Sequence, residues 1–492
     1  MNYVSTRGKN EKVFAAQAIK QGLAGNGGLF MPEELPSLSF DDLSTVCGMS
    51  YPEAAAKILS MFLTDYTYDE LLSDCEKAYG SAGFPDGAVN VAALDERIKI
   101  LELWHGPTCA FKDMALQIMP RLLSRALTKT DEKREALILV ATSGDTGKAA
   151  LEGYKNVPGI KIEVFYPETG VSKIQKKQMA TQDGDNVRVC AIKGNFDDAQ
   201  SGVKKIFSDS EFCEKLNEKG VFLSSANSIN WGRLAPQIVY YVYGYCQMVK
   251  RGDIHMGDKI DVCVPTGNFG NIFAAFIAKK MGVPIERLIC ASNSNNVLTD
   301  FLSTGTYNRL REFHPTISPS MDILISSNLE RLLYLTAGCE ATAEYMRELN
   351  EKGSYTVSES VKEKLDEHFK GYFCSEENTK KTIKEAFAQG YLCDTHTAVA
   401  LYCAKQYISE TDGENKILVA STASAYKFAT SVLGSVSDSV PSDEFDAISE
   451  LERVSGVKAP APLSSLKDKS VRFNKSIDKD DMKEEVSDFA KE

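Results

Sequence analysis

Short runs of apolar residues alternate along this chain with longer stretches that have helical spacing. The apolar runs contain few polar interruptions, which is typical of strands that are buried on both faces of a parallel sheet. Stretches with helical spacing follow several of them. The alternation predicts an α/β fold in which helices cover both faces of parallel sheets. We expect strands at 98–103, 136–141, 161–166, 187–192, 259–264, 287–291 and 416–420, and helices at 146–155 and 271–281.

The two ends of the chain differ from this pattern. The first 90 residues are expected to be mainly helical, with helices at 52–62 and 68–79. Residues 25–36 are punctuated by glycine and proline and are predicted to be a loop. The segment 467–492 is strongly charged, so we expect a solvated surface segment there, with a docked peripheral helix or a frayed end as alternatives.

Composition excludes several classes of protein. The net charge is −12 and no basic stripe with interleaved aromatic residues occurs, so nucleic acid is not an expected partner. The twelve cysteines stand singly, which favours free thiols over a disulfide framework. No apolar run is long enough to span a membrane, and the first residues lack an apolar signal core. We therefore expect a cytoplasmic protein of two or three domains.

Lys112 is the strongest candidate for a chemically active side chain. It ends the run Trp104-His105-Gly106-Pro107-Thr108-Cys109-Ala110-Phe111-Lys112, where a predicted strand gives way to a helix. Burial favours the neutral, nucleophilic form of a lysine amine. The commonest chemistry that needs such an amine is a Schiff base with pyridoxal phosphate (PLP). The alternative is that Lys112 only packs its aliphatic chain.

A glycine loop far downstream could hold the phosphate of that cofactor. The predicted strand 259–264 runs into Pro265-Thr266-Gly267-Asn268-Phe269-Gly270, and a helix begins at Asn271. Glycines let backbone N–H groups approach an anion, and a helix N-terminus adds free amides and the positive end of its dipole. The loop lacks the Gly-Lys-Ser/Thr of a nucleotide-binding P-loop and the GxGxxG of a dinucleotide fold. An ordinary tight turn is the alternative.

A second loop has the same construction. The strand 136–141 leads into Thr142-Ser143-Gly144-Asp145-Thr146-Gly147 and then into a helix. Ser143 and Thr146 offer hydroxyl groups beside exposed amides, which suits a carboxylate or a second phosphate. Asp145 could equally cap the helix. Two such loops together with one lysine in apolar surroundings favour a binding site over three unrelated turns.

Three further segments carry polar side chains that could bind ligands. Residues 224–233 are dense in serine and asparagine and end in Arg233, and arginine recognises phosphate or carboxylate in a bidentate manner. Residues 326–331 and 421–424 also carry side chains that can form hydrogen bonds, mainly serine, threonine and asparagine. In each case a capped helix or turn is the alternative. A neutral hydroxyl at the carboxyl edge of the strand 416–420, facing a pyridine nitrogen, would favour β-type chemistry on hydroxy-amino acids.

The histidines do not indicate a metal site or a hydrolase. None of the five has HxxxH or HExxH spacing, so we expect no bound metal. No GxSxG motif accompanies them, which argues against Ser-His-Asp hydrolysis. His105 lies in a Gly-Pro turn close to Lys112, where a structural hydrogen bond and a role in the site are both open.

An ordered set of motifs resembles threonine synthases of the longer microbial and fungal kind. The resemblance runs almost from end to end, and although related PLP enzymes share single motifs, the ordered set is specific. The motifs are Tyr3-Val4-Ser5-Thr6-Arg7-Gly8, residues 27–33, His105-Gly106-Pro107-Thr108 with Ala110-Phe111-Lys112-Asp113, residues 143–147, residues 227–231, residues 267–271, Ser326-Ser327-Asn328, residues 394–398 and Ser421-Thr422-Ala423. Two positions depart from the family pattern, because Thr395 and Ala425 stand where the family usually has proline. Both departures concern local rigidity of a turn.

The resemblance implies a PLP enzyme of fold type II, with two doubly wound parallel-sheet domains and a mainly helical N-terminal region. It implies an N-terminal domain over 1–90, a large PLP-binding domain over 91–112 and 227–466, and a small α/β domain over 113–226, followed by the charged tail 467–492. Lys112 would carry the Schiff base, and Thr422 would face the pyridine nitrogen. The cofactor phosphate would lie against Gly267, Asn268, Phe269, Gly270 and Asn271. Residues implied to bind substrate are Ser143, Asp145, Thr146, Ser228, Asn230, Arg233 and Asn328.

The reaction implied by the resemblance converts O-phospho-L-homoserine and water to L-threonine and phosphate. A monomer or a homodimer is expected. One alternative is another PLP lyase of the same fold, such as a threonine or serine dehydratase. A second alternative is a non-catalytic, metabolite-binding paralogue, although the intact Lys112 and residues 267–271 argue against it. A nucleotide-binding kinase is disfavoured by the absent P-loop lysine.

Overall fold

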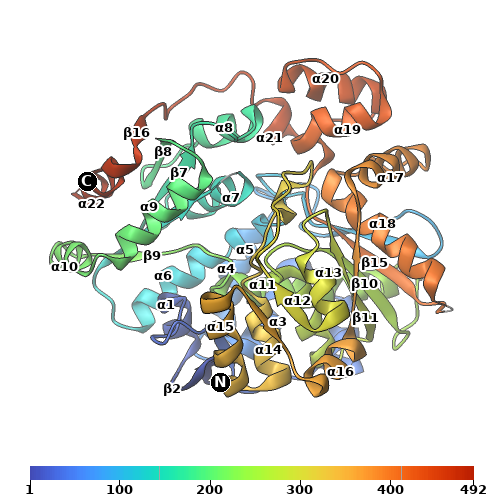
Figure 1. Cartoon of the computed structure of the whole chain (residues 1–492), viewed down its shortest axis with the longest axis horizontal. Helices are drawn as coiled ribbons and strands as arrows, with labels where there is room; N and C mark the ends of the chain where they lie inside the picture. The colour runs from blue at the N-terminus through green and yellow to red at the C-terminus, as the bar shows by residue number, and fades with distance from the viewer. Residues whose placement is uncertain (143, 412, 492) are drawn as a thin grey trace.

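The computed structural model describes residues 1–142, 144–411 and 413–491, and for residues 9–11 it describes the backbone alone. In this part of the chain, two mainly parallel sheets lie side by side (Figure 1). The larger sheet has the strand order β14-β11-β10-β15-β5-β4, and only β4 runs antiparallel to its neighbour. Its strands are β4 (Asn90–Ala93), β5 (Ile98–Glu102), β10 (Ile260–Pro265), β11 (Ile285–Ser292), β14 (Phe369–Phe373) and β15 (Lys416–Ser421).

The smaller sheet is parallel throughout and has the order β16-β8-β7-β6-β9. Its strands are β6 (Glu135–Ala141), β7 (Ile160–Pro167), β8 (Val187–Lys193), β9 (Val221–Ser224) and β16 (Ser476–Asp478). All seven strands expected from the apolar runs are present in the two sheets, with ends shifted by at most two residues. The α/β fold with parallel sheets is therefore confirmed.

Successive residues of the central strands enter different apolar cores, which explains why these runs are almost wholly apolar. In β15, Leu418 and Ala420 join one buried cluster, whereas Ile417 and Val419 join another. In β6, Ile138 belongs to the first cluster and Leu137 and Leu139 to a third. Each sheet is thus buried on both faces, as parallel sheets generally are.

Helices cover both sheets. The helices around the smaller sheet, and between it and the larger sheet, are α5 (Asp113–Leu116), α6 (Met119–Lys129), α7 (Asp145–Tyr154), α8 (Lys173–Ala180), α9 (Phe196–Ser208) and α10 (Ser210–Glu218). The following ones are α11 (Trp231–Lys250), α12 (Gly270–Met281), α13 (Val297–Thr304), α14 (Leu329–Ala337), α15 (Cys339–Lys352), α16 (Glu359–His368), α17 (Glu376–Ala388) and α18 (Thr395–Glu410), with the short pair β12 (Thr306–Asn308) and β13 (Ser354–Thr356). The last ones are α19 (Ala429–Val436), α20 (Glu444–Ser455), α21 (Ala461–Ser464) and α22 (Met482–Lys491), and 3-10 turns occur at η1 (Pro319–Met321), η2 (Ala425–Phe428) and η3 (Lys479–Asp481).

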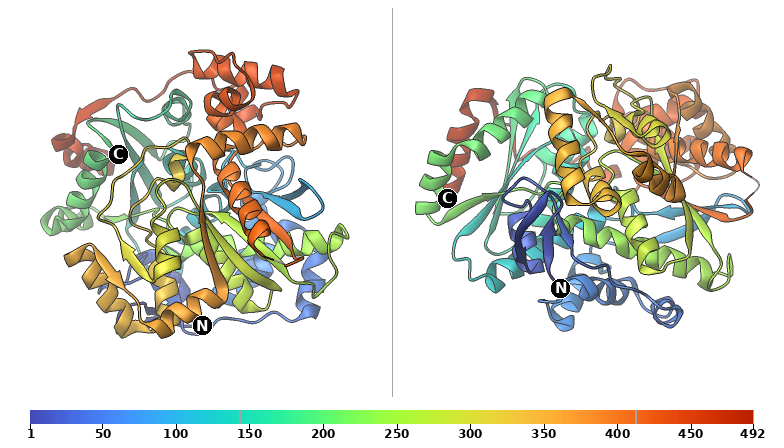
Figure 2. Two further views of the ribbon diagram at one scale, coloured as in Figure 1. Left: turned by 45° about the vertical axis from the view of Figure 1, so that its right-hand side comes forward. Right: turned by 60° about the horizontal axis from the view of Figure 1, so that its bottom comes forward.

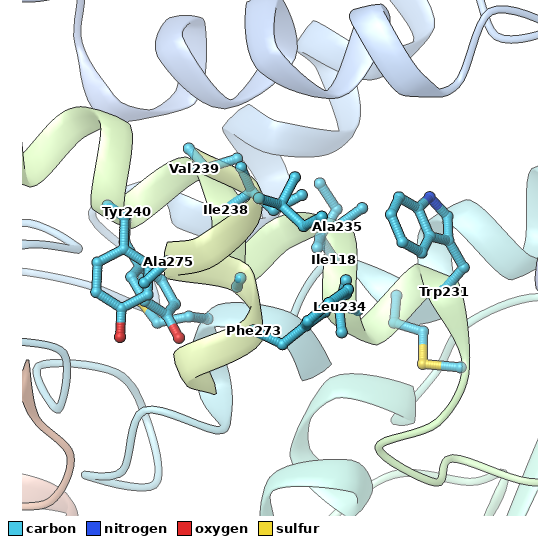
Figure 3. Close-up of a cluster of buried hydrophobic side chains, with 14 of the residues drawn as sticks. Ile118, Trp231, Leu234, Ala235, Ile238, Val239, Tyr240, Phe273 and Ala275 are labelled. Atoms are coloured by element: carbon cyan, nitrogen blue, oxygen red, sulfur yellow. The ribbon is translucent and has the colours of Figure 1, made fainter. Parts of the chain in front are cut away.

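The buried helix α11 lies at the centre of the first core (Figure 3). Trp231, Leu234 and Ile238 of this helix belong to the core, as do Ile118 and Phe273 of neighbouring elements. The helix is polar only on small parts of its surface, because it is surrounded by other elements on nearly every side. Arg233 lies in the first turn of α11, so the position of the helix also fixes Arg233.

The N-terminal region contains the predicted helices and an unpredicted sheet. Its helices are α1 (Ala15–Gln21), α2 (Phe40–Cys47), α3 (Tyr51–Phe62) and α4 (Tyr68–Tyr79). Strands β1 (Tyr3–Ser5), β2 (Gly8–Val13) and β3 (Phe30–Pro32) form an antiparallel sheet with β1 in the middle. The expectation of a loop over 25–36 was therefore wrong at β3. Strands of three residues are too short to show an alternating pattern.

The charged tail is docked and not merely solvated. Strand β16 pairs with β8, and α22 buries Met482, Val486 and Phe489 against the smaller sheet. Both figures of the whole chain show α22 beside α9 (Figures 1 and 2). The docked helix was the alternative expectation, and the structure supports it over a solvated segment. The domain boundaries inferred from the resemblance stay a prediction.

Candidate active site

Lys112 lies at the start of α5, in a segment tied to the end of the central strand β15. The backbone N–H of Phe111 donates to the carbonyl of Thr422 at 2.8 Å, and the N–H of Ser424 donates to the carbonyl of Cys109 at 3.0 Å. The fold therefore brings Lys112 and Thr422 together although 310 positions separate them in the sequence. The turn before α5 is closed by Asp113, which accepts hydrogen bonds from the N–H and hydroxyl of Thr108.

The amine of Lys112 has two polar neighbours. Its Nζ donates to Oγ of Ser320 at 3.2 Å and lies 3.8 Å from Oδ2 of Asp145. The side chain is 12% exposed. Burial lowers the pKa of Lys112, Asp145 opposes this effect, and the cations Lys427 and Arg233 reinforce it. This is the environment that favours a neutral amine.

The glycine loop connects β10 to α12 and is pinned from outside. Phe269 has a left-handed backbone with φ of 60° and forms the N-cap of α12. The carbonyl of Gly267 accepts from the hydroxyl of Ser326 at 2.8 Å, and that of Asn268 accepts from Nδ2 of Asn328 at 3.0 Å. The first amides of α12 have no acceptor within the helix, so they are available to an anion.

Asn271 carries a buried donor without a partner. Its Oδ1 accepts from the hydroxyls of Tyr240 and Tyr241, each at 2.6 Å, which fixes the orientation of the amide group. Its Nδ2 is buried and has no hydrogen-bond partner among the described residues. An orphaned buried donor is costly unless a ligand supplies an acceptor. The loop, Asn271 and the amine of Lys112 together fit a phosphate-bearing aldehyde such as PLP.

The second loop brings a carboxylate to the amine. Oγ1 of Thr142 accepts from the N–H groups of Gly144 and Gly147, both at 3.1 Å, which fixes the turn into α7. Asp145 does not cap the helix with its side chain. Its Oδ1 instead binds Nζ of Lys427 at 2.9 Å and Nε2 of Gln175 at 3.0 Å. Burial opposes the charge, but Lys427 and Lys112 outweigh it, and the pKa of Asp145 lies well below its ordinary value.

Arg233 is a buried cation without an acidic partner. Its guanidinium donates one hydrogen bond, to the carbonyl of Ala226 at 2.8 Å, while Nε is buried and unpartnered. Among the described residues no carboxylate forms an ion pair with it, and burial lowers the pKa of Arg233 to about 10. A cation in this state is suited to an anionic ligand.

Other predicted site residues have side chains that support the backbone. Asn230 caps α11 by accepting from the N–H of Gly232, and it donates to the carbonyl of Ile19 at 2.8 Å. Nδ2 of Asn328 also donates to the carbonyl of Ser228 at 3.3 Å. Thr146 and Ser228 are half-buried. Ser143 lies outside the described residues.

Three residues at the site were not predicted. Ser320, Lys427 and His396 contact the amine of Lys112 directly or through one neighbour. Nε2 of His396 accepts from the N–H of Ser320 at 3.1 Å, and its Nδ1 contacts Asp394 at 2.9 Å. His396 was included only in the motif 394–398, and neither Lys427 nor Ser320 was singled out.

Two open alternatives are resolved in favour of structural roles. His105 binds Oε2 of Glu102 through Nε2 at 2.9 Å and stacks on Trp104. Arg331 donates to the carbonyls of Phe30 and Ile229 and to the side chain of Asn328. Both side chains are held by contacts within the protein.

The remaining sequence expectations concern thiols, metals and membranes. Each of the twelve cysteines is a free thiol, and nine of them are buried. Over residues 1–142, 144–411 and 413–491, no group of three or more histidine, cysteine, aspartate or glutamate side chains could hold a metal ion. In the same ranges, the helices are too short or too polar to cross a membrane.

Comparison with known proteins identifies the family. Residues 2–79 match the family model described as "Threonine synthase N terminus", and residues 90–423 match that described as "Pyridoxal-phosphate dependent enzyme". The threonine synthase of Saccharomyces cerevisiae is 36% identical to this chain, over 93% of each protein. The chain belongs to the threonine synthase family of PLP-dependent enzymes. Pyridoxal phosphate is accordingly its cofactor, and the fold is that of type II PLP enzymes.

Solved structures agree with this family assignment. The PLP-bound threonine synthase from Brucella melitensis has a TM-score of 0.89 at 34% identity and covers 100% of both chains. The yeast threonine synthase structure has a TM-score of 0.89 at 32% identity and covers 100% of this chain and 98% of that one.

Human threonine synthase-like 1 is 41% identical over 85% of this chain. This chain spans only 58% of the length of that human relative.

Proposed function

We propose that this protein converts O-phospho-L-homoserine and water to L-threonine and phosphate. The observation that carries the proposal is that two buried cations occur at one site: Lys112, whose amine is desolvated, and Arg233, which has no acidic partner among the described residues and whose Nε is unpartnered. Membership of the threonine synthase family supports the same reaction. We further propose that the protein acts in the cytoplasm, as a monomer or a homodimer.

In the proposed arrangement, Lys112 binds the cofactor, residues 267–271 hold its phosphate, and Thr422 faces its pyridine nitrogen. Nδ2 of Asn271 would donate to an acceptor of the cofactor, since it has no partner in the protein. Bound PLP supplies an electron sink for carbanions next to the substrate amine. A neutral hydroxyl at the pyridine nitrogen weakens that sink, which suits elimination and addition at the substrate side chain.

The protein's own groups then bind the substrate and move its protons. Arg233 and the loop 143–147 would bind the phosphate and carboxylate of the substrate, with Ser228 beside them, while Asn230 and Asn328 hold the surrounding backbone. The released amine of Lys112 would move protons at Cα and Cβ while phosphate leaves from Cγ. Water then adds at Cβ. Arg233 would favour departure of phosphate because it stabilises the leaving anion.

The test is an assay that couples phosphate release to threonine formation, with and without added PLP. Equal amounts of both products, lost in Lys112→Ala, are expected. The matched control is Lys384→Ala, which removes an exposed lysine and should leave the rate unchanged. Formation of 2-oxobutanoate in place of threonine would favour a dehydratase, and absence of turnover with bound PLP would favour the non-catalytic alternative. A Lys112→Ala protein that still made threonine would refute the proposal.

A further inference from the structure

Lys427 is a buried cation at the junction of the two sheets that the proposed chemistry does not use. It belongs to η2, just after the central strand β15 of the larger sheet, and its side chain is 0% exposed. Its Nζ donates to the carbonyl of Thr108 at 2.8 Å and contacts Oε1 of Gln178 at 3.4 Å. Its one ionic partner among the described residues is Asp145, at 2.9 Å.

Asp145 belongs to α7, which covers the smaller sheet, so this ion pair joins the two halves of the site. The two oxygens of Asp145 have different partners. Oδ1 binds Lys427 and Gln175, and Oδ2 lies 3.8 Å from Nζ of Lys112. A carboxylate held through one oxygen presents the other in a fixed direction, which here is toward the amine of Lys112.

We propose that Lys427 is a positioning residue that holds the Asp145 carboxylate beside the nitrogen of Lys112 and shares its negative charge. The sharing sets how strongly Asp145 favours a proton on that nitrogen. The proposal rests on the proposed function, in which Lys112 binds the cofactor.

The charges around Lys112 come from several elements. Asp145 lies on α7, Lys427 on η2, Arg233 on α11 and Asp113 on α5. Lys148 of α7 and the thiol of Cys109 lie near the same group of charges. Lys427 is the cation that binds the carboxylate directly. Without its charge, Asp145 would act on the nitrogen of Lys112 alone and would stabilise its protonated state more strongly.

The test is a pH titration of the holoenzyme followed by absorbance. The visible spectrum of PLP reports whether the lysine nitrogen joined to it carries a proton. In Lys427→Met the midpoint of the spectral transition should rise by about one pH unit, a typical effect of one nearby charge. In Lys427→Arg, which keeps the charge, it should stay near that of the wild type.

A second variant approaches the pair from the other side. Asp145→Asn removes the negative charge, so the midpoint should fall. The control Lys173→Met breaks an exposed ion pair with Asp443 and should shift nothing. Circular dichroism and thermal melting establish that each variant is folded.

Three outcomes would overturn the inference: an unchanged midpoint in folded Lys427→Met, a shift of the same sign in Lys427→Met and Asp145→Asn, or an equal shift in Lys173→Met. If Lys427→Met does not fold, Lys427→Gln is the second variant that removes the charge, and an unchanged midpoint in it would equally overturn the inference. Failure of the proposed function would give a different result. If Lys112 does not bind the cofactor, the Lys112→Ala protein keeps the visible spectrum that the titration follows.

Discussion

Replacing Arg233 by methionine should make the unliganded protein slightly more stable and much less active. The side chain is 5% exposed and donates a single hydrogen bond, to Ala226. Burial lowers the pKa of Arg233 from 12.5 to about 10, which corresponds to about 3 kcal/mol that disfavours the charged state in the fold. Methionine removes this cost but loses a charge-assisted hydrogen bond worth about 2 kcal/mol. The net gain is about 1 kcal/mol, or a melting temperature about 2 °C higher.

The loss of activity in Arg233→Met follows from the proposed contact with a substrate anion. Removing one partner of a buried charge pair costs about 2–5 kcal/mol, so kcat/KM should fall by roughly 30-fold to several thousand-fold. Differential scanning calorimetry of the unliganded protein and the threonine assay measure the two effects. Added O-phospho-L-homoserine should raise the melting temperature of the wild type more than that of the variant.

Arg331→Met is the matched control for Arg233→Met. Arg331 is buried as well, but its guanidinium donates to Phe30, Ile229 and Asn328. Its removal leaves carbonyl groups unpaired and should lower the melting temperature. If Arg233→Met were less stable than the wild type and had an unchanged kcat/KM, Arg233 would be a structural residue like Arg331, and the reasoning would be wrong.

Three further substitutions test the glycine loop, the tail and an ion pair. Gly267→Ala would place a Cβ atom 2.6 Å from the carbonyl of Ser320, so the loop must shift, and we expect PLP affinity in a fluorescence titration to fall at least about tenfold. Phe489→Ala removes a buried ring from α22 and should destabilise the smaller sheet by about 3–5 kcal/mol in urea unfolding. Glu152 is paired with Lys148, and the pKa of Glu152 is lowered from 4.5 to about 2. Glu152→Gln should therefore be less stable by about 2–3 kcal/mol at neutral pH, a difference that disappears as the pH falls from about 5 toward 2.

Each of these substitutions has a control at a less constrained position. Gly25→Ala places its Cβ in open space and should leave PLP affinity unchanged. Val471→Ala changes a side chain that is 52% exposed, next to the docked tail, and should alter stability by less than about 0.5 kcal/mol. For Glu152→Gln, the control is the direction in which its stability difference from the wild type changes with pH. A stability difference that grew on acidification would contradict the ion-pair explanation, because a lowered pKa gives stability that acid removes.

The residues predicted from sequence are those whose signal is local. Lys112 was recognisable because it is a cation at the end of an apolar strand, and residues 267–271 because glycines join a strand to a helix. Ser320 had no such signal. It lies in the short 3-10 turn η1, 208 positions from Lys112, and only the fold brings the two together. Lys427 looked like any lysine in a short turn, although its side chain is completely buried.

The elements that were missed had weak or conflicting patterns. Strands β1, β3 and β16 have three residues each, which is too few for periodicity to be read. The docking of α22 was recognisable in principle, since Met482, Val486 and Phe489 have the spacing of one helical face. The high charge of the segment outweighed that pattern. Lys479 and Lys483 of the tail are paired with Asp198 of α9 and with Asp209, which precedes α10, so part of this charge stabilises the docking.

The pairing of β16 with β8 has a consequence for how the protein is made. Strand β8 is complete at Lys193, but its outer neighbour begins only at Ser476. During synthesis the apolar strand β8 is therefore an open edge for the time needed to translate nearly three hundred residues. An open edge of this kind can pair with another chain. The smaller sheet of the nascent protein is thus exposed to misassembly, and we expect a chaperone to bind this edge during synthesis.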